Sequence, residues 1–283
     1  MKGLPELSKE LDDLAIIMQL TGAFEGLASM RISQIRNQVL GAQQFFNELW
    51  NIYTQIRVDT LFRFGRVNEN SAIDKQLCII ITSAGGFSGD IDQRLIDLMM
   101  THYDAAKQDI IVVGYHGAIL LRQKNITFKK YYKMPVKDVN INVEPLVREI
   151  RQYKSALVFY QTYKSLTEQA VSQIDISSAI RGLGAQATAS KDVISEANYI
   201  FEPSTFEVVA YLEQSMLQVA LGQVIFDSKL AQYASRFQAM SLAKNRAEDS
   251  LKYTKLLFSR AKRALRDEET KQIIASLRKV HAR

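Results

Sequence analysis

The chain has 283 residues, of which 47% are hydrophobic and 23% charged, a balance that excludes a disordered or fibrous protein. Its formal net charge of +6 favours acidic partners without choosing among nucleic acid, a membrane surface and another protein. Cys78 is the only cysteine, so no internal disulfide forms. No apolar run approaches the roughly 20 residues that span a bilayer, so we expect no direct membrane insertion.

The N-terminal segment carries an apolar residue at alternating steps of three and four. This spacing, held for about seven heptads, predicts one helix of a coiled coil, roughly 75–80 Å long. Only Thr21 and Glu25 break the series with plainly polar side chains. The series consists of Leu7, Leu11, Leu14, Met18, Thr21, Glu25, Ala28, Ile32, Ile35, Val39, Ala42, Phe46, Leu49, Tyr53 and Ile56.

The middle of the chain begins with a strand–turn–helix–strand pattern. Residues 77–82 form a short β-branched run that predicts a buried strand, and a glycine-rich turn follows at residues 83–90. Residues 91–103 have a helical pattern, and residues 109–114 predict a second buried strand. This order implies two parallel strands joined by a right-handed crossover.

Further along, residues 145–153 have the pattern of another helix. Residues 156–163 and 169–176 predict two more strands, arranged as a hairpin. Residues 180–197 are rich in Gly, Ala, Ser and Thr, which is typical of a loop. The middle segment therefore predicts a Rossmann-like α/β domain.

The C-terminal segment repeats the pattern of the N-terminal one. Pro203 and Ser204 supply a helix start signal, with Glu207 placed as in a capping box. The apolar series that follows is Val209, Leu212, Met216, Val219, Gln223, Phe226, Leu230, Tyr233, Phe237, Met240, Lys244, Ala247, Leu251, Thr254, Phe258, Ala261 and Leu265. Two such helices bury their stripes against each other or against a partner, and an antiparallel pair is the simplest geometry.

We therefore predict an α/β domain inserted into a long antiparallel coiled coil whose two terminal helices form a rod. The predicted boundaries are 1–66 for the N-terminal helix, 67–202 for the α/β domain and 203–283 for the C-terminal helix.

The glycine-rich turn lacks the features of a phosphate site. A Walker A loop ends in Gly-Lys-Ser/Thr, whereas Gly89 is followed by Asp90, a carboxylate in place of the cation. Gly85, Gly86 and Gly89 also lack the spacing of a dinucleotide fingerprint. We expect a structural turn that lets a helix pack close to its strand, and no cofactor.

Other polar groups give no sign of an active site. His102, His116 and His281 are scattered, with no acidic residue or cysteine at metal-ligand spacing. Basic groups at 129–130 and at 260–266 come without a recognised nucleic-acid motif, so we expect no nucleic-acid partner.

Three segments, in chain order, resemble the gamma subunit of F-type ATP synthases. Residues 81–92 read Ile-Thr-Ser-Ala-Gly-Gly-Phe-Ser-Gly-Asp-Ile-Asp, similar to the family's Thr-Ser-Asp-Arg-Gly-Leu-Cys-Gly-Gly-Leu-Asn. Residues 160–169 resemble its Tyr-Asn-x-Phe-x-Asn/Ser strand. Residues 199–204 read Tyr-Ile-Phe-Glu-Pro-Ser, where the family has Tyr-Ile-Tyr-Glu-Pro before its C-terminal helix.

The resemblance continues along that helix. Residues 236–240 are similar to the family's Arg-Met-x-Ala-Met, and residues 260–264 stand where Lys-Ala-Arg-Gln-Ala is usual. Glu269 and Ile273 match the motif that follows.

The resemblance implies a non-catalytic rotor subunit of a proton-translocating ATP synthase. Its coiled coil would turn inside a ring of alpha and beta subunits, and its α/β domain would hold the epsilon subunit and the membrane rotor ring. The protein would lie at the cytoplasmic face of the cell membrane, as a peripheral protein. The residues implied at the subunit interface are Arg236, Met240, Lys244, Arg260, Lys262, Arg263 and Glu269.

The sequence departs from the family at two places. Gly22 and Glu25 replace two lysines of the family's N-terminal helix, and residues 277–283, Leu-Arg-Lys-Val-His-Ala-Arg, replace its apolar tip. The interpretation as the shaft of a paralogous ATPase with another mechanical role therefore remains an alternative. Two further alternatives are a coiled-coil scaffold unrelated to ATPases and a nucleotide-binding enzyme with helical arms for dimerisation.

Overall fold

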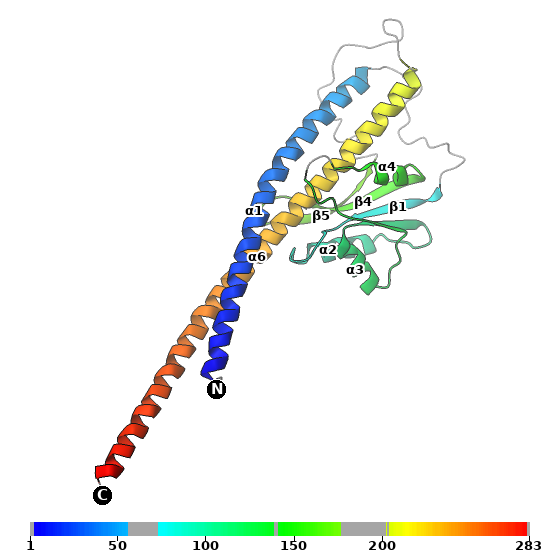
Figure 1. Cartoon of the computed structure of the whole chain (residues 1–283). Coiled ribbons are helices and arrows are strands. Elements are labelled where there is room, and N and C mark those ends of the chain that lie inside the picture. Colours follow the sequence, from blue (N-terminus) through cyan, green and yellow to red (C-terminus); the bar gives the residue numbers. More distant parts are fainter. Residues whose placement is uncertain (1–2, 56–72, 139–140, 177–201, 203, 282–283) are drawn as a thin grey trace. The chain divides into compact units, whose positions relative to one another are not determined.

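The computed structural model describes the whole chain except residues 1–2, 56–72, 139–140, 177–201, 203 and 282–283 (Figure 1). The chain divides into two compact units. One unit consists of Met1–Leu27 with Phe237–Arg283, and the other of Ala28–Arg236. We call them the paired-helix unit and the domain unit.

Two long helices supply residues to both units. Helix α1 extends over Leu4–Gln55 and α6 over Thr205–His281. At about 1.5 Å per residue they are about 78 and 115 Å long. The predicted helices are thus confirmed, and α6 continues well past the predicted heptad series. At its start, the backbone N–H of Glu207 donates to the Ser204 hydroxyl over 3.3 Å, the cap that the sequence predicts.

The domain unit contains a five-stranded sheet. The described elements between the long helices are β1 (Ile73–Ile81), α2 (Ile91–Met100), β2 (Gln108–Val113), α3 (Tyr115–Gln123), β3 (Lys130–Tyr132), α4 (Glu144–Ile150), β4 (Tyr153–Tyr163) and β5 (Gln169–Asp175). The strand order is β3-β2-β1-β4-β5, parallel except for the antiparallel β4–β5 pair. The predicted parallel pair is β1–β2 and the predicted hairpin is β4–β5, so both are confirmed.

Both faces of the sheet are covered by helices, because β1 is apolar on both sides. Ile79 and Ile81 face a core that includes residues of α4 and α6, among them Leu221. Cys78 and Ile80 face the other core, to which α2 and α3 contribute. The lone cysteine is therefore a buried apolar residue, and burial raises its thiol pKa to about 11.

Within the domain unit, α1 and α6 pack in opposite directions. Phe46 lies in one cluster with Met216, and Ile35 lies in another with Phe226. Nearer the C-terminal end of α1, the hydroxyl of Tyr53 lies 3.5 Å from the carboxylate of Glu213. Later residues of α1 therefore meet earlier residues of α6, as an antiparallel pair requires.

Sequence reasoning differs from the structure in a few elements. It missed α3 and the three-residue β3, and it extended α2 to residue 103, although the helix ends at Met100. The loop predicted at 180–197 lies outside the described residues.

Within the described part of the chain, one helix is long and apolar enough to cross a membrane by length and composition alone. The 18-residue window lies within Glu207–Leu277, with a mean hydropathy of 1.2, and 39% of it is buried inside the protein. Core helices of soluble proteins pass the same test, so this is weak evidence for a membrane span.

Candidate functional site: the paired helices and the glycine-rich turn

The paired-helix unit has a seam with a seven-residue repeat. On α6 the buried residues are Met240, Ala247 and Thr254, and on α1 they include Leu7 and Thr21. Buried positions seven residues apart are what coiled-coil packing produces. Thr21, a polar member of the predicted series, donates its hydroxyl to the backbone oxygen of Ile17 over 2.8 Å.

Lys244 links the two helices of this unit. Its ammonium lies 3.0 Å from a carboxylate oxygen of Glu25, and this hydrogen bond holds the pKa of Glu25 below its usual value. A Cβ built on Gly22 would lie 3.9 Å from Cε of Lys244. Gly22 and Glu25 are the two positions where the sequence departs from the family's lysines. Both lie at Lys244, so the α6 cation is matched by an acid on α1.

A second apolar stripe follows α1 on a different face from the seam. Ile17, Leu20, Phe24 and Leu27 are spaced three or four residues apart and are 46, 54, 37 and 52% exposed. Exposed apolar residues scattered singly are normal, but a row at helical spacing indicates an interaction surface. Sequence reasoning missed this row, although its 3,4,3 spacing was visible beside the seam series.

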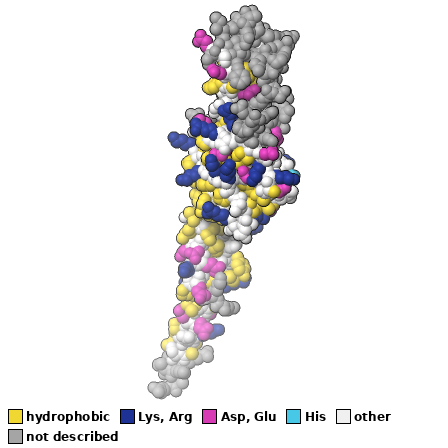
Figure 2. Space-filling model, turned by 90° about the vertical axis from the view of Figure 1, so that its right-hand side faces the viewer, with side chains coloured by type: hydrophobic (Ala, Val, Ile, Leu, Met, Phe, Trp, Pro, Cys, Tyr) yellow, Lys and Arg dark blue, Asp and Glu magenta, His cyan; other side chains and the backbone are white. Residues whose placement is uncertain are grey.

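The C-terminal part of α6 has little cover within its unit, where only Leu257, Phe258 and Ala261 are partly buried. None of residues 255–277 is buried. Figure 2 shows hydrophobic and charged side chains mixed along the face of the paired-helix unit that it draws. The exposed large apolar residues between 255 and 277 are Leu256, Leu265, Ile273, Ile274 and Leu277. Four of the predicted interface residues, Arg260, Lys262, Arg263 and Glu269, are exposed here and form no ion pair with a described residue.

The other three predicted interface residues have contacts inside the chain. Met240 is buried in the seam, and Lys244 is paired with Glu25. Arg236 is half-buried in the domain unit, with its guanidinium 5.6 Å from the ring centre of Tyr233. Burial lowers the pKa of Arg236. These side chains therefore have less surface left for a partner than the exposed group at 260–269.

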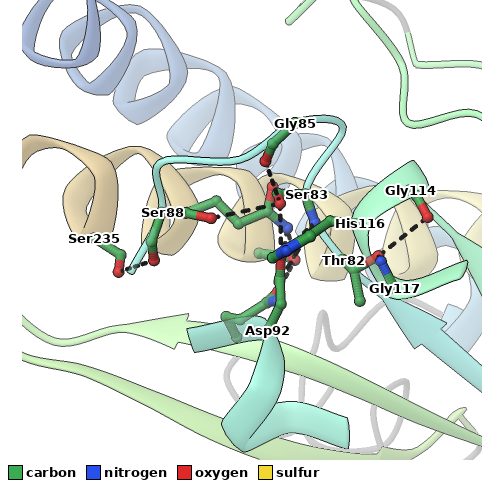
Figure 3. Close-up of polar contacts among 12 residues, drawn as sticks. Thr82, Ser83, Gly85, Ser88, Asp92, Gly114, His116, Gly117 and Ser235 are labelled. Carbon is green, nitrogen blue, oxygen red and sulfur yellow. Dashed lines mark hydrogen bonds and ion pairs between the residues drawn. The ribbon is translucent and has the colours of Figure 1, made fainter. Parts of the chain in front are cut away.

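The glycine-rich turn surrounds a buried carboxylate (Figure 3). Asp92, in the first turn of α2, has no exposed surface. It accepts hydrogen bonds from the backbone N–H and hydroxyl of Ser83, at 3.2 and 2.5 Å, and from the side-chain amide of Gln161, at 2.6 Å. The α2 N-terminus thus already holds an anion of the chain itself, which opposes phosphate binding at this turn.

His116 completes the surroundings of Asp92. Its Nδ1 lies 2.8 Å from a carboxylate oxygen of Asp92, and this hydrogen bond raises the pKa of His116. The arrangement is not a nucleophilic triad, because the Ser83 hydroxyl and the His116 ring both bond to the carboxylate and not to each other. The backbone N–H of His116 donates to the backbone oxygen of Ser83 over 3.2 Å, which does not involve the nucleophile. No group of three or more His, Cys, Asp or Glu in the described part of the chain could hold a metal ion.

The three glycines of the turn differ in their roles. Gly89 has φ of +63°, a conformation that L side chains rarely adopt, and a Cβ there would lie 3.6 Å from the Ser235 hydroxyl. A Cβ on Gly85 or Gly86 would meet open space. No neighbour within 4 Å therefore requires a glycine at position 85 or 86. The close approach lies at Gly114, whose Cβ would fall 2.1 Å from the backbone oxygen of Thr82.

The family model described as ATP synthase matches residues 3–278 of the chain. The chain is 24% identical to the ATP synthase gamma chain of Mycoplasmoides gallisepticum, with 99% of this chain and 100% of that relative covered. It is 21% identical to the ATP synthase gamma chain of Chlorobium phaeobacteroides, with 97% of each covered.

Solved structures share the fold. A chain from the mitochondrial ATP synthase of Euglena gracilis (OSCP/F1/c-ring, rotational state 3) superposes with a TM-score of 0.67, at 13% identity, covering 98% of this chain and 95% of that one. A chain from the Tetrahymena thermophila mitochondrial ATP synthase, central stalk and c-ring, gives a TM-score of 0.54 at 15% identity, covering 79% and 99%.

Proposed function

The chain belongs to the ATP synthase family, and from that membership we propose that it is the rotating central-stalk (gamma) subunit of an F-type ATP synthase or ATPase. Its partners are the alpha and beta subunits of the catalytic ring, the epsilon subunit and the membrane rotor ring. It makes and breaks no bonds itself, and it works at the cytoplasmic face of the membrane as a peripheral component.

The observation that carries the proposal is the uncovered length of α6. Residues 255–277 include no buried residue, yet they carry large apolar side chains and the exposed charges at 260–269. Such a helix is suited to a partner that surrounds it. Together with the exposed row on α1, it offers the ring several chemically different faces.

The mechanism requires that the faces differ. A shaft shifts a beta subunit between conformations only by contacting one conformation better than another. The row Ile17, Leu20, Phe24 and Leu27 offers an apolar face. The cluster Arg260, Lys262 and Arg263 offers a cationic one. As the shaft turns, each ring subunit meets these faces in sequence, and its preferred conformation changes with them.

We assign a separate role to each of the three predicted segments of the chain. Residues 1–66 and 203–283 form the shaft, and residues 67–202 form the α/β domain that holds the epsilon subunit and the membrane ring. Of the predicted interface residues, we assign ring contact first to Arg260, Lys262, Arg263 and Glu269, because they are exposed. Arg236, Met240 and Lys244 are assigned a weaker share, since each already has contacts within the chain.

The test is purification of the tagged full chain from its native cells, with identification of the subunits that accompany it. We expect alpha- and beta-type ATPase subunits. Leu20→Asp should reduce their recovery, since it places a charge in the exposed α1 row. Leu166→Asp is the matched control, because Leu166 is 44% exposed in the α/β domain, against 54% for Leu20.

Absence of ring subunits with the parent chain would overturn the proposal. Recovery of ring subunits without a membrane rotor would favour a paralogous ATPase with another mechanical role. Equal loss in the two leucine variants would show that the α1 row is not the contact surface.

A further inference from the structure

Helix α6 carries a buried row of polar side chains in the domain unit. Ser228, Gln232 and Ser235 are spaced four and three residues apart, so they lie on one face of the helix. Their exposed fractions are 0, 5 and 7%, in a stretch of α6 that is buried on nearly all sides. Lys229 lies next to the row and is 3% exposed. Buried polar groups of this kind need partners, and each of them has one.

Two members of the row bond to the same strand residue. The hydroxyl of Ser228 donates to Oε1 of Gln161 on β4, and Nε2 of Gln232 donates to the same oxygen over 3.2 Å. Nε2 of Gln161 in turn donates to Asp92 over 2.6 Å. The helix is thus connected through Gln161 to the carboxylate that organises the glycine-rich turn.

The other two side chains bond to two different loops. The hydroxyl of Ser235 donates to the backbone oxygen of Ser88 over 2.7 Å, within the glycine-rich turn (Figure 3). The ammonium of Lys229 donates to the backbone oxygen of Pro135 over 2.8 Å and forms a buried ion pair with Asp138. The α/β domain therefore holds one short stretch of α6 by directional bonds from a strand, a turn and a loop.

Hydrogen bonds fix the rotation of a helix about its axis more precisely than apolar packing does. An apolar face can rotate or slide by a fraction of a turn and still bury similar area. A hydrogen bond weakens steeply once its angle or distance is wrong. One residue of a helix corresponds to about 100° of rotation about its axis. Any such rotation of α6 would break the bonds from all three partners at once.

We propose that Ser228, Lys229, Gln232 and Ser235, with Gln161, form a rotational lock that fixes the angle of α6 about its own axis relative to the α/β domain. The inference rests on the proposed function, in which torque passes between this domain and the shaft. The four α6 residues and Gln161 are positioning residues: they contact no nucleotide, but they set the angle at which the faces of the shaft meet the ring.

A contribution to folding stability does not by itself explain why these polar residues are buried in α6. Replacing both partners of a buried hydrogen bond by apolar groups of similar shape is often nearly neutral, and buried ion pairs are often no more stabilising than apolar replacements. A specific geometry is what such groups supply when apolar packing would serve for stability.

The experiment measures angular precision in the assembled complex. The variant is Gln161→Met with Ser228→Ala and Gln232→Met, which removes the bonds to β4 while Asp92 keeps its bonds from Ser83 and His116. A probe is attached through Lys107→Cys, a site on the α/β domain whose side chain is 83% exposed. The native Cys78 is buried and should not be labelled. Single-molecule recordings then follow the probe during ATP hydrolysis by the immobilised ring.

We expect the triple variant to assemble and hydrolyse ATP, with pauses spread over a wider range of angles than in the parent. Leu221→Ala is the matched control, because Leu221 is a fully buried α6 residue in the apolar core against the sheet. It should lower stability and leave the pause angles as sharp as in the parent.

Pauses as sharp in the triple variant as in the parent would overturn the lock, as would equal broadening in Leu221→Ala. If the triple variant fails to assemble, Ser235→Ala alone is recorded, since it removes only the bond to Ser88. Unchanged pauses there would count against the lock in the same way. Failure of the parent itself to assemble or to rotate would instead overturn the proposed function.

Discussion

The pair formed by Glu25 and Lys244 allows a charge-swap test of the paired-helix unit. The variants are Glu25→Lys, Lys244→Glu and the double exchange. With 3.0 Å between the charged atoms, the Coulomb attraction is about 1.4 kcal/mol at the dielectric constant of water. The two side chains are 20 and 41% exposed, so we discount this to the roughly 0.2–1 kcal/mol measured for surface pairs.

Each single variant replaces this attraction by repulsion, so we expect a loss of about 0.5–2 kcal/mol in the free energy of unfolding. The double exchange should recover most of that loss. Urea unfolding followed by far-ultraviolet circular dichroism measures the free energy, and amide hydrogen exchange of residues 237–254 shows whether the loss lies in this unit. The matched control is the exchange of Glu248 and Lys252, an exposed i,i+4 pair within α6, which should change stability by only a few tenths of a kcal/mol.

The pH dependence gives a second check. The folded pKa of Glu25 is lowered, so its contribution is present above the unfolded value of about 4.3 and is lost as the pH falls through the folded pKa. The difference in free energy of unfolding between the Lys244→Glu variant and the parent should therefore become smaller in acid. A double exchange no more stable than the two single variants would refute the reasoning, because no coupling would then exist between the residues.

Four further outcomes follow from the structure. Gly89→Val should cost about 1–3 kcal/mol in urea unfolding because of its positive φ, whereas Gly86→Val should cost less than about 1 kcal/mol. Burial raises the pKa of Asp227 to about 6, which penalises its ionised form; Asp227→Asn should therefore stabilise the chain by up to about 3 kcal/mol at pH 8, with the gain fading as the pH falls toward 4. Arg236→Ala should lower the free energy of unfolding by about 0.5–1 kcal/mol, through loss of its contact with the Tyr233 ring. Amides of residues 255–281 should exchange rapidly in the isolated chain and slowly in the assembled complex, as measured by mass spectrometry.

The sequence was sufficient for the elements whose burial repeats at short range. Both long helices follow from the 3,4 series, and the buried strands β1, β2 and β4 follow from β-branched runs. Helix α3 was missed because Gly114 and Gly117, which approach Thr82, disguise a nine-residue helix that begins directly after a strand. Strand β3 is too short, at three residues, to show any alternation.

The cluster of polar side chains around Asp92 in the domain unit could not be predicted from the sequence, for a different reason. Asp92, His116 and Gln161 are separated by 24 to 69 positions along the chain, and only the strand order brings them together. The same limit affects the interface residues. A sequence motif gives a residue's position along α6, but which face is buried depends on where α1 lies. The 3,4 series had already placed Met240 in the seam, where it is buried, but the motif around Arg263 did not show that this residue is exposed.

The uncovered part of α6 poses an energetic problem that a partner would solve. Residues 255–281 are about 40 Å of helix without a buried residue among those described up to 277. Isolated helices are only marginally stable in water unless tertiary packing adds to them, because the cost of nucleation is repaid slowly by each further residue. Thr254 is the last fully buried residue of the seam and only Leu257, Phe258 and Ala261 are partly buried beyond it, so packing within the chain supplies little of that stabilisation. Apolar residues such as Leu265 and Ile273 would supply it when buried by a surrounding ring, at about 25 cal/mol for each Å² of apolar surface covered. Rigidity of the shaft inside the ring is therefore a property of the complex rather than of the chain, which is why the exchange of these amides should depend on assembly.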